Sequence, residues 1–341
     1  MNPVTITRRT EPVPRHDEPL AQATLCSLCP KLCRPTCPVS AATGRESVAP
    51  WRIADAVVRT TEWTLPVVEQ VASCTGCGAC GEPCLPGTNL PELSRAARAA
   101  AASAGVALPA TVAIRERIAM TGSPLRPTAD ALGEAGTPLL LGCPAPPGTE
   151  EAARALFDAA GEPVRTVGGC CGAVAFDLGL VPEATALATR MAERLGDRVV
   201  VGTPSCARMI RDEWPRLGVA APTVVTAVEW LAHAPLSFVA DIGPVAWHPP
   251  CTLTRALGVV EEPLRVLAAL GAEVRTPTRD GCSGAGAAYA LVDRNGAEAV
   301  AAARLADLAA LDAPPVTACP SAAKALGASD LLVLAASRLA R

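Results

Sequence analysis

The sequence contains two dense runs of cysteine, CSLCPKLCRPTCP at residues 26–38 and CTGCGACGEPC at residues 74–84. Each run supplies four thiols, which is the number that an iron–sulfur cubane requires. In proteins with two cubanes, the fourth cysteine of each run binds the other cluster. The spacing therefore predicts two [4Fe–4S] clusters. The expected ligand sets are Cys26, Cys29, Cys33 and Cys84 for one cluster, and Cys37, Cys74, Cys77 and Cys80 for the other.

Zinc is the alternative metal for these runs. Zinc sites usually combine two separated C-x2-C pairs, so two runs of four cysteines fit cubanes better. The first run departs from the common spacing, because Pro30, Lys31 and Leu32 separate its second and third cysteines. This extra residue leaves open which cysteine crosses to the other cluster.

The bulk composition also favours metal over disulfides. The chain has 15 cysteines among 341 residues, and the odd number cannot pair completely. Arg8 and Arg9 are followed by polar residues rather than an apolar stretch, and no run of about 18 apolar residues occurs. We therefore expect a cytoplasmic protein without a membrane segment, whose contact with the inner face of a membrane would be made through partners. A net charge of −3 gives no reason to expect a nucleic-acid partner.

The periodicity of the apolar residues changes along the chain. Helical periodicity at 50–59 and 113–120 indicates an α-helical first part, and we expect the alanine-rich stretch 95–104 to be a solvent-exposed helix. From about residue 137, short apolar runs alternate with amphipathic segments, which predicts an α/β fold with parallel strands. The expected domains are a flexible N-terminal arm at 1–22, an α-helical two-cluster ferredoxin-like domain at 23–95, a helical connector at 96–136, and two α/β repeats at 137–236 and 243–339.

The two α/β repeats are visible as matching cysteine motifs. Cys143 and Cys251 each follow a strand-like run. The tetrapeptide GCCG at 169–172 corresponds to GCSG at 281–284, and TPSC at 203–206 corresponds to CPSA at 319–322. The second copy is therefore the more degenerate one.

A two-cluster ferredoxin module followed by two such repeats resembles the CCG-domain (cysteine-rich domain) iron–sulfur oxidoreductase subunits. These include the iron–sulfur subunits of glycolate oxidase, lactate utilisation and anaerobic glycerol-3-phosphate dehydrogenase systems, and the heterodisulfide reductase subunits. In that family a complete repeat supplies five thiolates. Here Thr203 replaces one of them in the first repeat, and Ser283 and Ala322 replace two in the second.

The resemblance implies metal in the repeats to different degrees. The first repeat keeps four thiols for a further iron–sulfur cluster or zinc, namely Cys143, Cys170, Cys171 and Cys206. The second keeps three thiols for weak metal binding, namely Cys251, Cys282 and Cys319, with His248 close by in sequence. Buried free cysteines are common, so the second repeat can equally be a vestige that keeps only its shape.

The resemblance also implies a function. We expect an electron-transfer subunit that relays electrons from a partner FAD-dependent dehydrogenase, of the 2-hydroxy acid or glycerol-3-phosphate type, to a quinone or another carrier. No P-loop and no complete dinucleotide fingerprint occurs, so we expect no FAD or NAD on this chain and assign no catalytic residue. One alternative is a heterodisulfide-reductase-like catalytic subunit with a metal centre in the first repeat. Another is a structural scaffold with zinc in the repeats.

Overall fold

The structure is a computed structural model that describes residues 23–26, 29–125, 135–279, 281–286 and 288–340. The expected N-terminal arm, and part of the expected connector, lie outside the described residues. The first part of the chain is helical, as expected. Its helices are α2 (Pro38–Thr43), α3 (Pro50–Arg59), α4 (Leu65–Ala72), α5 (Leu90–Ser103) and α6 (Pro109–Thr121).

Proline sets the start of these five helices. Each has a proline in its first turn, where the missing N–H would have no partner within the helix. Gly122 ends α6 in the left-handed conformation that glycine adopts easily. The helix expected at 50–59 is confirmed as α3, and its Ile53 lies in one apolar core with Val71 of α4 and Leu93 of α5. That core also contains Cys26 and Cys80, so the cysteine loops are part of the packed module.

Helix α5 differs from the expected exposed helix. Its buried face contains Leu93, Ala97, Arg98 and Ala101. It packs against α3 and α4 on one side and against α8 (Ala173–Asp177) on another. The small alanine side chains allow this close approach from two directions, so the alanine-rich composition reflects packing rather than exposure.

The first repeat is a four-stranded parallel sheet in the order β2-β1-β3-β4. Its strands are β1 (Thr137–Leu140), β2 (Val164–Thr166), β3 (Arg198–Val201) and β4 (Thr223–Thr226). Its helices, besides α8, are α7 (Thr149–Ala159), α9 (Val181–Leu195), α10 (Pro204–Arg208) and α11 (Ala227–His233). The apolar runs at 139–141 and 199–201 thus supply the two central strands.

The second repeat has the same sheet order, β6-β5-β7-β8, and all its pairings are parallel. Its strands are β5 (Gly243–His248), β6 (Ala272–Arg275), β7 (Pro315–Thr317) and β8 (Ser329–Asp330). Its helices are α12 (Glu261–Ala269), α13 (Tyr289–Val292), α14 (Arg294–Ala309), α15 (Pro320–Leu326) and α16 (Leu331–Ala336). The identical strand order confirms the α/β fold with two tandem repeats.

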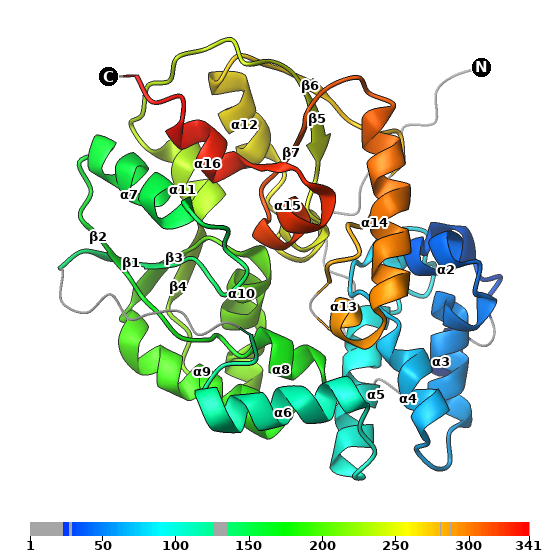
Figure 1. Ribbon diagram of the computed structural model, residues 1–341. Helices are drawn as coiled ribbons and strands as arrows, with labels where there is room; N and C mark the ends of the chain where they lie inside the picture. Colours follow the sequence, from blue (N-terminus) through cyan, green and yellow to red (C-terminus); the bar gives the residue numbers. More distant parts are fainter. Residues whose placement is uncertain (1–22, 27–28, 126–134, 280, 287, 341) are drawn as a thin grey trace.

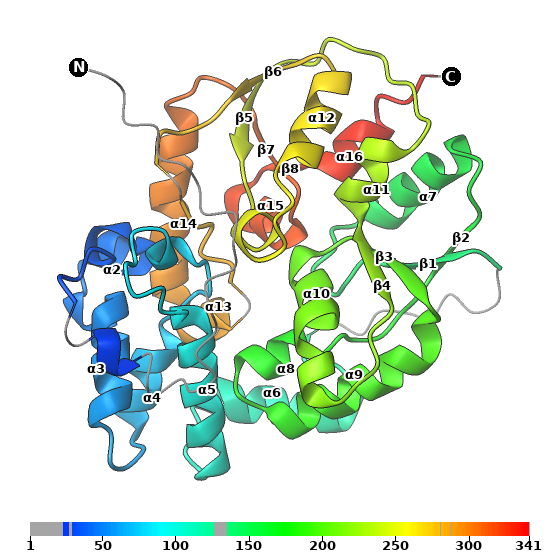
Figure 2. The ribbon, with the colours of Figure 1, turned by 180° about the vertical axis from the view of Figure 1, so that it is seen from behind.

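The helical module lies against both repeats (Figures 1 and 2). Helix α2 packs along α14 of the second repeat, and α5 contacts α8 of the first. The repeats also contact each other, through α7 with α16 and through α11 with α12. None of the helices in the described part of the chain is long and apolar enough to cross a bilayer.

Candidate metal centres

The inner cysteine group of the helical module surrounds one small cavity. It is lined by four thiols, those of Cys37, Cys74, Cys77 and Cys80, together with apolar side chains such as Ile53 and Leu90. Burial raises the pKa of Cys37 to about 12, and the charges of Cys77 and Cys74 add to the shift. Burial likewise raises the pKa of Cys80, with Cys74 contributing. We call these four residues the inner thiol group.

The outer thiol group consists of the other four cysteines of the module, Cys26, Cys29, Cys33 and Cys84. Burial raises the pKa of Cys33 to about 11, and the neighbouring charges of the other three raise it further. In the outer group Cys29, Cys33 and Cys84 are half-buried and Cys26 is buried, whereas the inner group has two half-buried cysteines, Cys37 and Cys74, and two buried ones, Cys77 and Cys80. The structure therefore gathers the thiols into the two sets that the spacing predicts, with one more half-buried cysteine in the outer set.

The extra residue of the first run is accommodated in a turn. Lys31 adopts a left-handed backbone conformation, with φ of 61°. Its N–H points back to the Sγ atom of Cys29 at 3.3 Å. The insertion therefore bends the loop locally, and Cys33 still lies with Cys26 and Cys84.

Both groups fit the donor requirements of a cubane. Each group supplies four thiols, which matches the ligand number, and those of the inner group line an apolar cavity. Backbone amides donate to the sulfurs in both groups, as Gly76 does to Cys74 at 3.4 Å and Thr88 to Cys84 at 3.3 Å. Such N–H···S contacts are among the factors that set cluster potentials. Within the described ranges, no three His, Cys, Asp or Glu side chains have the geometry of a single-ion site. When bound, the clusters would supply one-electron redox chemistry.

The cysteines of the first repeat converge at the carboxyl ends of its strands. Cys143 follows β1, the Cys170–Cys171 pair follows β2, and Cys206 lies in α10 after β3. The pKa of Cys143 is raised to about 12 by burial and the charge of Cys170. A hydrogen bond with Cys171 lowers the pKa of Cys206, but burial and nearby thiolates leave it raised.

Thr203, which stands where the family has a further thiolate, has a structural contact instead. Its hydroxyl donates to the carbonyl oxygen of Leu141 at 2.6 Å, which ties the ends of β3 and β1 together. A Cβ atom at Gly142 would lie 2.7 Å from this hydroxyl and 3.1 Å from the Cys206 sulfur. Glycine is therefore needed for these loops to approach each other.

A thiol of the second repeat forms hydrogen bonds with the helical module. Cys282 donates from Sγ to the Thr75 hydroxyl at 3.6 Å, and its hydrogen bond to Cys77 lowers the pKa of Cys77 to about 6. A hydrogen bond with Cys282 also lowers the pKa of Cys251. Cys282 of the second repeat thus contacts the inner thiol group and Cys251 contacts Cys282, an arrangement that the sequence did not indicate.

The remaining cysteine of the second repeat lies toward the first repeat. Burial raises the pKa of Cys319 to about 12, with Cys251 contributing. The charge of Cys319 also acts on Cys206 of the first repeat. In the second repeat, Cys251 and Cys282 therefore lie toward the inner thiol group, whereas Cys319 lies toward Cys206 of the first repeat.

The imidazole of His248 forms a hydrogen bond within the protein. Its Nδ1 atom accepts from Nε of Arg304 at 3.0 Å, and the residue is 2% exposed. Burial and the Arg304 charge lower the pKa of His248 to about 3. The imidazole is therefore neutral at pH 7, and its Nδ1 lone pair is not available to a metal.

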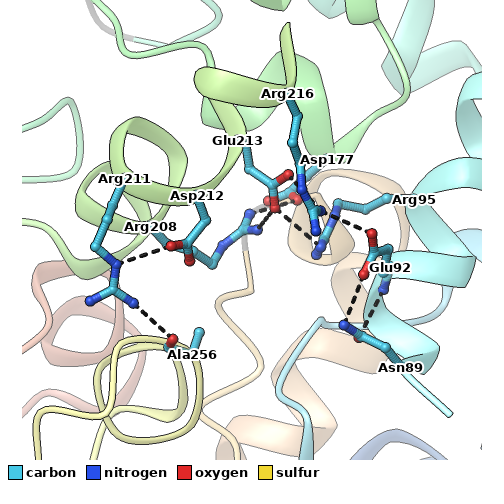
Figure 3. Close-up of polar contacts among 10 residues, drawn as sticks. All are labelled: Asn89, Glu92, Arg95, Asp177, Arg208, Arg211, Asp212, Glu213, Arg216 and Ala256. Atoms are coloured by element: carbon cyan, nitrogen blue, oxygen red, sulfur yellow. Dashed lines mark hydrogen bonds and ion pairs between the residues drawn. The ribbon is translucent and has the colours of Figure 1, made fainter. Parts of the chain in front are cut away.

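A largely buried group of charged residues lines a cavity together with Cys74 and Cys77 of the inner thiol group. Figure 3 shows most of these charged residues, namely Arg95, Asp177, Arg208 and Glu213. We call this group the arginine cluster, and it consists of Arg95, Arg98, Asp177, Arg208 and Glu213. Nη1 of Arg208 donates to Glu213 at 2.6 Å, and Nη2 donates to Asp177 at 3.3 Å. Sequence reasoning missed these residues. The one local signal is the three-residue spacing of Arg95 and Arg98, which places them on the same helix face.

The fold and the thiol groups define a class, an iron–sulfur protein with a ferredoxin-like module joined to two cysteine-rich α/β repeats. Comparison with known families gives the same class of protein. Residues 22–87 match a 4Fe-4S dicluster domain, and residues 139–211 and 245–323 match the cysteine-rich domain. The chain belongs to the CCG-domain iron–sulfur subunit family.

A curated relative is Lactate utilization protein A of Geobacillus kaustophilus (strain HTA426). It is 31% identical over a stretch that covers 36% of this chain and 58% of the relative. The match thus spans less than two thirds of the relative's length.

Proposed function

We propose that this chain is the iron–sulfur electron-transfer subunit of an oxidoreductase that resembles the lactate utilisation systems. The observation that carries the proposal is the gathering of eight cysteines into an inner and an outer group of four thiols. Two cubanes held in this way accept and release electrons one at a time. The outer group has one more half-buried cysteine than the inner group, and the inner group contacts the second repeat, which suits a relay from a partner into the molecule.

In this proposal another subunit performs the organic chemistry. A partner dehydrogenase carries FAD and oxidises a 2-hydroxy acid or a related substrate, and the flavin passes its two electrons singly to this chain. A quinone or another carrier takes them up. The chain acts on the cytoplasmic side and reaches the membrane through its partners. The relative's printed name supports the substrate class.

The first repeat supports a third metal centre in the same relay. Cys143, Cys170, Cys171 and Cys206 provide four thiols, which is enough ligands for a further iron–sulfur cluster or for zinc. Zinc would require these side chains to move, because no three of them now have the geometry of a single-ion site. The second repeat is a weaker candidate, because Cys251 and Cys282 are engaged with each other and with the inner thiol group.

The test is the iron, zinc and sulfide content of the full chain purified without oxygen, together with EPR spectra. We expect about eight irons per chain in cubanes, and about four fewer in Cys74→Ser. Cys143→Ser is the matched control and should keep both cubane signals. Irons beyond eight that disappear in Cys170→Ser would assign a third cluster to the first repeat. Zinc in place of iron at the inner thiol group would contradict the relay.

A further inference from the structure

Arg98 is a buried cation whose guanidinium group is only partly hydrogen-bonded. The residue is 5% exposed, and neither its Nε nor its Nη1 atom has a hydrogen-bond partner among the described residues. An arginine side chain stays protonated in proteins, so this site holds a positive charge. A buried charge is unfavourable unless a neighbouring anion offsets it.

The arginine cluster as a whole has a surplus of positive charge. Arg208 bridges Glu213 and Asp177, and Arg95 lies 3.4 Å from Glu213. The side chains in these ion pairs are at most 14% exposed. Three arginines therefore face two carboxylates, which leaves a formal charge of +1.

The contacts at the rim of the arginine cluster do not remove this surplus. Arg216 contacts Glu92 as well as Glu213, and Arg211 contacts Asp212 (Figure 3). Each of these additional arginines brings one additional carboxylate. The net charge of +1 within the cluster therefore remains.

The surplus charge faces the inner thiol group. Cys74, Arg95, Arg98 and Arg208 line one cavity of about 260 Å³ where the helical module meets both repeats. Burial raises the pKa of Cys74, while the charges of Arg98 and Arg95 lower it. Arg255 lines the same cavity and donates to the backbone oxygen of Cys77 at 3.3 Å.

The outer thiol group has a different electrostatic surrounding. The pKa of Cys33 responds to burial and to the thiolates of its own group. The pKa of Cys26 responds to burial, to the Thr88 hydroxyl and to those thiolates. The cavity that holds the arginine cluster is lined by Cys74 and Cys77 of the inner group, and none of the four outer cysteines lines it. The inner group therefore lies nearer to the surplus positive charge.

We propose that the arginine cluster is the counter-charge of the inner cluster and makes its reduction potential higher than that of the outer one. This inference rests on the proposed function, since it requires both cubanes. Reduction adds one negative charge to a cluster, and a nearby buried cation stabilises that charge. Electrons that enter at the outer thiol group then move downhill to the inner one. Arg98 is a positioning residue, which acts on the cluster through its charge.

The test is an EPR-monitored redox titration of the full chain with both clusters bound, in which the inner signal is identified by its loss in Cys74→Ser. In Arg98→Met we expect the equilibrium constant for reducing the inner cluster to fall about tenfold, which is about 59 mV for one electron. The outer cluster should not change. Arg98→Lys keeps the positive charge, so the inner cluster of this variant should have a reduction potential close to that of the wild type. Arg59→Met, which removes an exposed arginine of α3, is the control and should leave both potentials unchanged.

Glu213→Gln provides a test of opposite sign. It removes one negative charge from the arginine cluster with little change in shape, so the inner potential should rise. This variant also keeps the inference testable if Arg98→Met does not fold. The proposal would be overturned if the reduction potential of the inner cluster were unchanged in both variants. Equal shifts in the potentials of the inner and outer clusters would also overturn it. A wild-type chain without iron would instead contradict the proposed function, so the two failures are distinguishable.

Discussion

At the scale of single residues, His248 shows how one buried contact determines a titration. Its ring accepts from Arg304 and is closed off from water, so protonation is disfavoured in the folded state. The folded pKa of about 3 lies below the ordinary value of 6.5. Below pH 6.5 the unfolded chain therefore binds a proton that the folded chain does not, and stability is lost as the pH falls.

The prediction for His248 is a difference in pH dependence. Between pH 7 and pH 5.5, His248 should cost the wild-type protein about 1 kcal/mol of unfolding free energy. His248→Gln, whose amide oxygen can still accept from Arg304, should lack this loss. His233→Gln, at an exposed histidine of α11, is the control. Denaturant unfolding at the two pH values measures the effect. If the unfolding free energy of wild type and of His248→Gln fell equally between pH 7 and pH 5.5, the imidazole would not be a buried, neutral group.

At the scale of secondary-structure elements, the start of α16 combines a good cap with an unfavourable charge. Asp330 ends β8, and its carboxylate accepts from the N–H of Leu332 at 3.0 Å. Burial raises the pKa of Asp330 to about 6. The folded pKa exceeds the usual value of 3.8, so stability is lost as the pH rises from about 4 through about 6.

Asp330→Asn should therefore stabilise the protein at neutral pH. Asparagine caps a helix as well as aspartate does and carries no charge, so we expect a gain of about 1 to 3 kcal/mol at pH 7. The gain should shrink as the pH is lowered toward 4. Asp330→Ala loses the cap, so it should be less stable than Asp330→Asn by about 1 kcal/mol. Thermal unfolding at several pH values measures this, and a destabilised Asp330→Asn at pH 7 would contradict the assignment.

At the scale of the whole molecule, the inner cysteine loop is pressed against the second repeat. A Cβ atom at Gly286 would overlap with the backbone carbonyl group of Thr75, and Arg255 forms an ion pair with Glu82 at 2.7 Å. Helix α14 contributes a second attachment, since Asp293 at its start accepts from Arg45 of the helical module. The inner thiol group is thus shaped by segments about 200 residues apart in the chain.

Gly286→Ala should loosen this junction. The added methyl group must displace the backbone around Thr75, at a cost of about 1 to 3 kcal/mol. We expect four of the irons to be lost faster to a chelator, with the outer cluster retained. Gly81→Ala, where a methyl group meets open space in the same module, is the matched control. Iron release with wild-type kinetics from Gly286→Ala would show that the junction does not support the inner cluster.

Several features were determined by the sequence itself, because their causes are local. Proline in the first turn fixes where α3 begins, and alternating apolar segments specify the strands and helices of both repeats. The cysteine spacing predicts two sets of four thiols, and the structure places those thiols together. Their role as cluster ligands stays a prediction that metal analysis will test.

Other features were decided only by the tertiary structure. The spacing from Arg95 places Arg98 on one helix face but does not show that this face is buried. The burial came from α8 and the rest of the first repeat packing on α5. In the same way, the degenerate motif around Cys282 gave no sign that its thiol would lie against Cys77. Ligand spacing and helix starts depend on neighbouring residues, whereas burial and the electric field at a cluster depend on which distant segments pack around it.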